Sequence, residues 1–213
     1  MKTLTKELQA AITPAMALDL LKEGNKRFVN NLKVNRNLLQ QANETSDGQH
    51  PFAVILSCID SRTSVELIFD QGLGDVLSVR IAGNIINEDI LGSMEFGCKM
   101  LGAKIIVVLG HSKCGAVKGA CDHLEMGNLT ALLSKIQPAV YAEKTITENR
   151  NSDNEEFVEK VAAINVRKTA HAIMERSPIL NEMILNGAVE IIGGNHDIAS
   201  GEVSFYDDTL IVG

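Results

Sequence analysis

The sequence predicts an α/β protein with a central, mostly parallel sheet of about four strands, flanking helices, an N-terminal helical arm and a C-terminal edge strand. Two observations carry this prediction: four continuous apolar runs end abruptly in polar residues, and helical stretches separate them. Apolar runs without alternation are typical of strands buried on both faces of a parallel sheet. Parallel neighbours need crossover connections, which are right-handed in this class.

Length and composition favour one folded unit spanning residues 1–213. The chain is long enough for a domain with a substantial core, or at most two small ones, and it shows no repeat or linker. Its formal net charge of −7 argues against nucleic acid as a general partner, although a local basic pocket for a small anion stays compatible with it. No apolar run approaches the roughly 18–20 residues of a membrane span, so we expect no membrane partner.

The cysteine count and the N-terminal residues predict a cytoplasmic location. Four cysteines are too few for a disulfide scaffold, which indicates a reducing compartment. Residues 1–48 mix charged and apolar side chains and lack the uninterrupted apolar core of a signal peptide. We expect them to form an amphipathic helical arm, followed by an α/β core over residues 49–213.

The four apolar runs define the expected parallel strands. They are PFAVILSC (51–58), DVLSVRIA (75–82), KIIVVLGH (104–111) and VEIIGG (189–194). Before the last of them, Ser177 as N-cap, Pro178 as first helical residue and Gly187 as the stop delimit a helix. After a turn-like ASG, the tail GEVSFYDD (201–208) predicts a final strand, antiparallel at the sheet edge.

Other helical stretches follow the first three strands. They are residues 64–72, residues 88–102 and a segment from Cys114 to about Leu133. The polar, aperiodic residues 146–157 predict a surface loop leading into another helix through Val161, Ile164 and Val166.

Two polar clusters, SCIDSR (57–62) and GHSKCGAVKGAC (110–121), follow predicted strands. Cys58 ends the first strand, His111 ends the third, and Cys114 comes three residues later. Open α/β sheets place their ligand sites at the carboxyl ends of strands, so these three side chains can converge. Two thiolates and an imidazole suit zinc. Alternatively, the cysteines are small buried hydrophobes and the histidine is a hydrogen-bonded strand-end residue.

The remaining cysteines and histidines have weaker claims to a reactive role. Cys121 lies about 10 Å from Cys114 along a regular helix, too far for both sulfurs to bind one zinc, and Cys98 should face the sheet. We predict core positions for Cys98 and Cys121. Surface or capping positions are expected for His50, His123 and His171. His196 follows the fourth strand and is interpreted as a turn histidine, a pH-sensitive element or a proton-transfer residue.

The spacing argues against three other chemistries. A thiol-phosphatase loop needs an arginine where Ser64 stands, and Asp60 would repel a phosphate. The GLG at 72–74 lacks the rest of a dinucleotide fingerprint, and there is no Walker-type phosphate loop. A Gly-x-Ser-x-Gly nucleophile elbow is also absent from the sequence.

Two of the motifs occur together in a combination that is much less expected by chance than either motif alone. Cys-x-Asp-Ser-Arg at 58–62, followed by Gly-His-Ser-x-Cys-Gly at 110–115, resembles the beta-class carbonic anhydrases. ELIFDQGLGD (66–75) and VRIAGN (79–84) are similar to that family as well, and the resemblance extends from about residue 51 to residue 117. It implies zinc-dependent, reversible hydration of carbon dioxide to bicarbonate and a proton by zinc-bound hydroxide.

The resemblance implies one zinc per subunit, held by Cys58, His111 and Cys114. It also implies that Asp60 and Arg62 form the catalytic dyad beside the metal. A carboxylate only accepts hydrogen bonds, so Asp60 can hold the proton of the hydroxide and orient its lone pair, while Arg62 clamps the carboxylate. If Asp60 turned away from Arg62, it could become the fourth ligand and close the site. The alternative for this pair is an ordinary surface ion pair.

The same resemblance assigns residues to the substrate pocket. They are Gln49, Gly83, Asn84, Phe96 and Gly115. Three positions depart from the family pattern: Thr63 replaces the usual valine and should make the mouth of the site more polar, Ile55 stands where bicarbonate-inhibited members carry tryptophan, and His196 replaces a frequent tyrosine.

Two alternative functions stay open on the same fold. One is hydrolysis of COS or CS2, and the other is a non-catalytic, zinc- or bicarbonate-responsive protein whose site Asp60 closes. The resemblance further implies a homodimer or homotetramer in which the N-terminal arm wraps a neighbour and the pocket forms between subunits.

Overall fold

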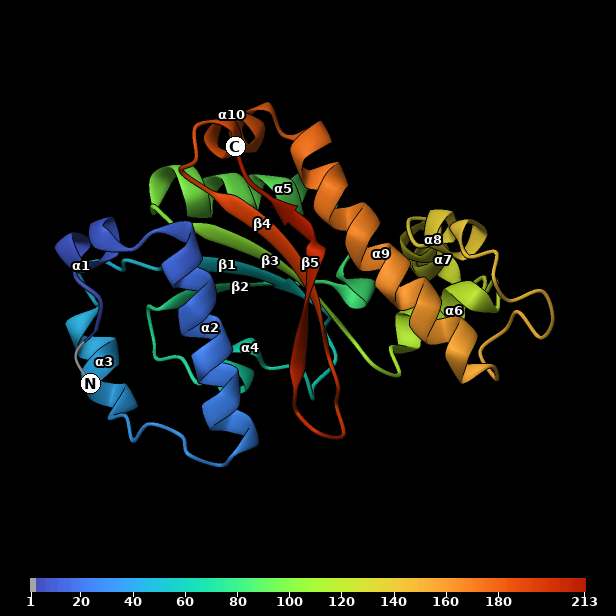
Figure 1. The fold of residues 1–213 in the computed structure, drawn as a ribbon, viewed down its shortest axis with the longest axis horizontal. Helices are drawn as coiled ribbons and strands as arrows, with labels where there is room; N and C mark the ends of the chain where they lie inside the picture. Colours follow the sequence, from blue (N-terminus) through green and yellow to red (C-terminus); the bar gives the residue numbers. More distant parts are fainter. Residues whose placement is uncertain (1–2) are drawn as a thin grey trace.

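The computed structural model describes residues 3–213, which form one five-stranded sheet with helices on both faces (Figure 1). The strand order is β2-β1-β3-β4-β5; β1 to β4 run parallel, and β5 pairs antiparallel with β4. The strands are β1 Ala53–Ser57, β2 Val76–Arg80, β3 Ile105–His111, β4 Glu190–His196 and β5 Val203–Ile211. The predicted fold class, with its parallel strands and antiparallel edge strand, is confirmed.

Burial along the strands follows their place in the sheet. β1 and β3 lie in the middle, and all of their residues are buried. β2 alternates between more and less buried positions. The prediction that residues 75–82 are buried on both faces is therefore wrong, because β2 is an outer strand that the helical layers cover only in part.

Two helical layers bury the two faces of the sheet. On one face, α2 (Pro14–Val29) and α4 (Val65–Ile68) pack against alternate side chains of β1 and β3. On the other face lie α5 (Glu88–Glu95), α9 (Glu155–Arg176) and α10 (Pro178–Leu185). A third apolar cluster, formed largely by the helices that gather beside the first half of α9, adjoins the carboxyl ends of the strands (Figure 1).

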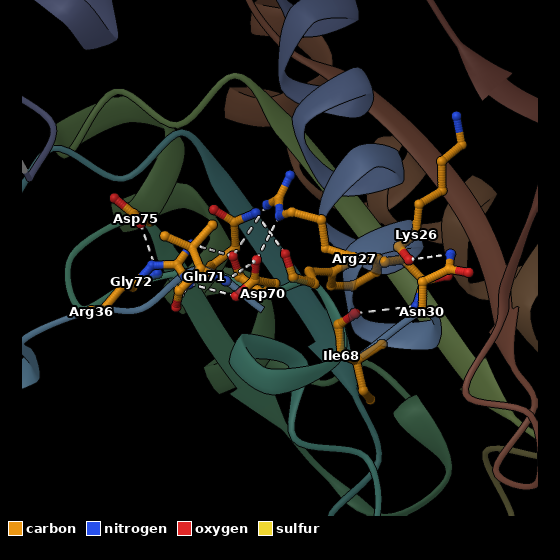
Figure 2. Close-up of polar contacts among 12 residues, drawn as sticks. Lys26, Arg27, Asn30, Arg36, Ile68, Asp70, Gln71, Gly72 and Asp75 are labelled. Atoms are coloured by element: carbon orange, nitrogen blue, oxygen red, sulfur yellow. Dashed lines mark hydrogen bonds and ion pairs between the residues drawn. The ribbon is translucent and has the colours of Figure 1, made fainter. Parts of the chain in front are cut away.

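The N-terminal arm is helical, as predicted for residues 1–48, although residues 1 and 2 lie outside the described part. It contains α1 (Lys6–Ala11), α2 and α3 (Leu38–Glu44). A buried ion cluster fastens it to the segment after α4 (Figure 2). Arg27 Nε and Arg36 Nη1 donate to the Asp70 carboxylate at 2.6 and 2.5 Å. Asp70 adopts a left-handed conformation, with φ +45°, which ends the helix predicted over residues 64–72 after Ile68.

Two other predicted helices are interrupted. The stretch 88–102 is α5 followed by a π-helical turn, η2 (Phe96–Met100). The segment after Cys114 divides into α6 (Gly115–Cys121) and α7 (Gly127–Leu133), because His123 after α6 and Gly127 at the start of α7 take positive φ values. The short helix α8 (Gln137–Ala142) was not predicted.

The observed bounds of the last two helices agree better with the bounds predicted from the sequence. α9 begins at Glu155 with Asn154 as its N-cap, so only the last residues of the predicted loop 146–157 are helical. α10 begins and ends as predicted: the Ser177 side chain accepts from Leu180 N, and Gly187 follows the helix with φ +68°. Over residues 3–213, none of the helices combines the length and apolarity needed to cross a bilayer.

Candidate metal centre

The order of the strands brings Cys58, His111 and Cys114 together. The chain leaves β1 toward β2 on one side, then returns to β3 on the other, so β1 and β3 flank the point where the order reverses. Cys58 follows β1, His111 ends β3, and Cys114 is the N-cap residue of α6. Ser57 is in register with Leu109, so the two strands end at almost the same level.

The three side chains form a compact group of metal-ligating atoms. All three are buried, and their ligating atoms lie within 4.8 Å of one another. The Cys58 and Cys114 sulfurs are 4.0 Å apart, about twice the length of a disulfide bond. The convergence expected from the topology is confirmed.

The hydrogen bonding of His111 matches that of a metal ligand. Its Nδ1 lies 2.9 Å from the carbonyl oxygen of Ser112, which can accept a hydrogen bond from it. Its Nε2 is buried and has no hydrogen-bond partner within residues 3–213. A ring held through one nitrogen, with the other facing two sulfurs, is the arrangement that zinc sites use. The residues present therefore fit a zinc ion.

The cluster also shifts the pKa values of its own members. The contact with the Cys114 sulfur lowers the pKa of Cys58 against the effect of burial, with help from His111 and the Gly83 N–H. The same contact with Cys58, together with burial, raises the pKa of Cys114. Burial opposes a charge on His111, but its contact with Cys58 outweighs this and raises the His111 pKa. One thiolate thus forms readily, and negative charge is available to hold a cation.

Asp60 and Arg62 form a two-pronged ion pair beside the cluster. Arg62 Nε donates to Asp60 Oδ1 at 2.9 Å, and Nη2 donates to Oδ2 at 2.7 Å. The Arg62 backbone N–H also donates to Oδ1, at 2.9 Å. These bonds hold the pKa of Asp60 well below its usual range. The Asp60 side chain is 17% exposed and that of Arg62 is 53% exposed, so the carboxylate is the more enclosed partner.

Arg80 is a contributor that sequence reasoning missed. This last residue of β2 donates through Nε to the Cys58 carbonyl at 3.0 Å and through Nη2 to the Asp60 carbonyl at 2.6 Å. One guanidinium therefore links the backbone of a candidate metal ligand to that of the dyad carboxylate. Arg80 lies within the family-like VRIAGN, but contacts to carbonyl groups leave no mark in the sequence that could have identified this role.

The predicted pocket residues divide into two groups. Gly83 and Asn84 lie buried in η1 (Ala82–Asn84), where the Gly83 N–H donates to Cys58 Sγ at 3.4 Å. Gly115 is exposed at the start of α6. Gln49 is exposed before β1, and Phe96, 56% exposed, lines a groove beside β2. Their roles in substrate binding stay predictions.

His123 and His171 are exposed, as predicted for surface residues, and His50 is partly exposed. Four other residues singled out from the sequence are buried. His196 lies in β4 rather than in a turn, is in register with His111, and has no hydrogen-bond partner on either ring nitrogen within the described chain. Burial, with the nearby His111, lowers its pKa to about 4. Thr63 is fully buried, so the expected polar mouth is wrong at this position. Cys98 and Cys121 belong to the apolar core, as predicted.

Comparisons with known proteins identify similar sequences and folds. Residues 53–203 match the family described as carbonic anhydrase. The chain is 34% identical over 206 residues to carbonic anhydrase 2 of Mycobacterium tuberculosis, covering 91% of this chain and 93% of that one. It is 33% identical to a carbonic anhydrase of Mycolicibacterium smegmatis, over 89% and 92% of the two chains. A solved tetrameric beta-carbonic anhydrase from Sordaria macrospora aligns with a TM-score of 0.70 at 25% identity, covering 91% and 95%.

Proposed function

Since this chain belongs to the beta-class carbonic anhydrase family and has carbonic anhydrase activity, we propose that it hydrates carbon dioxide reversibly with a zinc ion held by Cys58, His111 and Cys114. The observation that carries the proposal is the buried group of two sulfurs and an unpartnered imidazole nitrogen. When bound, zinc lowers the pKa of a coordinated water and supplies a hydroxide nucleophile near neutral pH.

Asp60 orients the nucleophile in this proposal. Its carboxylate is ionised because Arg62 lowers its pKa, and an ionised carboxylate can only accept hydrogen bonds. It would therefore accept a hydrogen bond from the attacking hydroxyl group and direct the oxygen lone pair toward carbon dioxide. The pairing of both carboxylate oxygens with Arg62 supports this orienting role over closure of the site by Asp60.

The supporting residues hold the loop in place. Arg80 fixes the carbonyls of Cys58 and Asp60, and Arg62 fixes the rotation of the Asp60 carboxylate. Positioning of this kind contributes to rate because the reacting groups need no rearrangement at the moment of attack.

The proposal is tested by stopped-flow hydration of carbon dioxide on protein of measured zinc content, from about pH 6.5 to about pH 9. Two thiolates cancel the formal charge of the ion, so the rate should rise toward alkaline pH. Cys58→Ser should lose zinc and activity, whereas Cys98→Ser, an equally buried cysteine in the core, should keep both. Full activity in Cys58→Ser would overturn the mechanism. Parallel assays with COS and CS2 should give much lower turnover.

Asp60→Asn separates orientation from metal binding. We expect it to retain zinc and to lose roughly 100-fold in turnover, because an amide can donate a hydrogen bond to the nucleophile and so misorient it. Unchanged turnover in this variant, at equal zinc content, would remove Asp60 from the reaction.

We further propose that the chain acts as a homodimer or homotetramer in the cytoplasm. Tetrameric relatives support the assembly, as do apolar side chains exposed along the arm, including Leu32 at 68% and Leu39 at 74% exposure. The four cysteines, all buried and none in a disulfide, support a reducing compartment.

A further inference from the structure

Asn165 is a buried polar residue on α9, and its side chain reaches the edge of the metal centre. It is 3% exposed, on a helix that packs against β3 and β4. Its Nδ2 donates to the Gly83 carbonyl at 2.9 Å, in a buried hydrogen bond that joins residues 82 positions apart. A buried amide needs such a partner, but the partner chosen here belongs to the turn that contacts Cys58.

Gly83 connects this hydrogen bond to the candidate ligand. Its N–H donates to Cys58 Sγ at 3.4 Å, so its two backbone groups face Asn165 and Cys58 respectively. These groups belong to successive peptide units joined at the Gly83 Cα, which has a φ of +68°. Glycine is the residue whose backbone rotates most freely, so an anchor on its carbonyl restricts the direction of its N–H.

The surroundings of Gly83 leave little room for another anchor. A Cβ at this position would lie 2.6 Å from Ile136 Cδ1, and the φ of +68° would strain any residue other than glycine. The turn is closed by the Asn84 N–H, which donates to the Ile81 carbonyl at 3.0 Å. The Asn165 side chain, on α9, therefore holds the Gly83 carbonyl of this turn from outside the turn itself.

We propose that Asn165 is a positioning residue of the metal centre, which acts through Gly83 to aim an N–H donor at the Cys58 sulfur. This inference rests on the proposed function, because it takes Cys58 to be a zinc ligand. A hydrogen bond to a metal-bound thiolate withdraws charge from the sulfur and orients it, so partners of this kind tune both metal affinity and reactivity. Losing the anchor should weaken zinc binding and shift the pH dependence of hydration.

The test compares two variants with a matched control from the same helix. Asn165→Leu keeps the approximate shape of the side chain, and Asn165→Ala removes it without crowding. Thr169→Val removes a buried polar group one turn later on α9. Zinc affinity is measured by chelator competition, and the pH profile of hydration is recorded at saturating zinc. Both Asn165 variants should bind zinc roughly 10- to 100-fold more weakly, while Thr169→Val stays within about twofold of the unmodified chain.

A second measurement needs no folded variant. In the unmodified chain loaded with ¹¹³Cd, the Gly83 amide proton should show scalar coupling to cadmium through the hydrogen bond to Cys58 Sγ. Absence of this coupling would overturn the inference. In whichever Asn165 variant folds, the coupling should weaken or disappear.

The outcomes separate this inference from the proposed function. If the unmodified chain binds no zinc, the proposed function fails. If it binds zinc and both Asn165 variants bind it equally well with the same pH profile, the inference alone is wrong. A loss of affinity in Thr169→Val as large as in the Asn165 variants would also contradict it, because the effect would then reflect general loosening of α9.

Discussion

The metal centre depends on single residues that differ in how far their sequence reveals them. Cys58, His111 and Cys114 could be predicted because each ends a strand or starts the next helix, and parallel strand ends meet at one edge. Arg80 and Asn165 could not, since both donate to backbone carbonyls and many types of donor side chain at the right distance could do the same. The metal ligands can therefore be predicted from their amino-acid types, whereas the residues that position these ligands cannot.

Arg80 allows a prediction at this level. Arg80→Ala should lower kcat/KM for hydration roughly 10-fold, because the carbonyls of Cys58 and Asp60 lose a shared donor. The kcat/KM of Arg80→Lys should lie between those of the unmodified chain and Arg80→Ala, since an ammonium group keeps the charge but lacks the two-pronged geometry that spans both carbonyls. Stopped-flow kinetics measure the effect, with Arg176→Ala, which removes a surface pair with Glu88, as the control. Equal losses in Arg80→Ala and Arg176→Ala would exclude a specific role.

Secondary-structure elements were predicted best where the core determines them. The central strands and α10 match their predicted positions, because continuous burial or N-cap and glycine signals define them. The break between α6 and α7 was missed because His123 turns the chain there with a positive φ, and a histidine is a weaker turn signal than a glycine. The extent of α4 was overestimated because tertiary contacts of Asp70 override the local helical pattern.

The ion cluster that fastens the arm should contribute strongly to stability. Asp70→Asn should lower the free energy of unfolding by about 3 kcal/mol, because it leaves the guanidinium of Arg36, 7% exposed, without its charged partner. Urea unfolding measures the change. Glu23→Gln removes an exposed partner of Lys26 and should cost less than about 0.5 kcal/mol. A similar small cost for Asp70→Asn would show that the cluster does not hold the arm.

Glu143, which follows α8, should contribute to the acid sensitivity of the fold. Burial opposes the charge on Glu143, but donors from Thr145, Ile146 and Arg150 outweigh it and lower its pKa from 4.5 to about 2. A lowered folded-state pKa stabilises the fold above about pH 4.5, and this contribution is lost as the pH falls toward about 2.

The corresponding variant has a defined pH signature. Glu143→Gln should be less stable than the unmodified chain at pH 7, by about 2 kcal/mol, and the difference should shrink between about pH 4.5 and about pH 2. Denaturant unfolding at several pH values measures it. A difference that stays constant across this range would contradict the assignment.

The whole molecule leaves apolar surface on its arm that a partner subunit can cover. Sedimentation should show a dimer or a larger assembly, and Leu39→Glu should shift it toward the monomer because a charge would be buried at the contact. Leu185→Glu, a change at a similarly exposed leucine on α10, should leave the assembly intact. An unmodified chain that sediments as a monomer at all concentrations would contradict the proposed assembly. The residues themselves indicate this contact surface only through the amphipathic pattern of the arm. Contacts between subunits depend on the shape of the folded surface, which the sequence pattern does not give.

The central claim is that one zinc ion is bound by two cysteines and one histidine at the ends of β1 and β3. Zinc K-edge X-ray absorption on the purified chain tests it most directly. The spectrum should show two sulfur ligands at about 2.3 Å and an imidazole nitrogen at about 2.0–2.1 Å, with about one zinc per chain. A shell made only of nitrogen and oxygen, or one with a single sulfur, would contradict it.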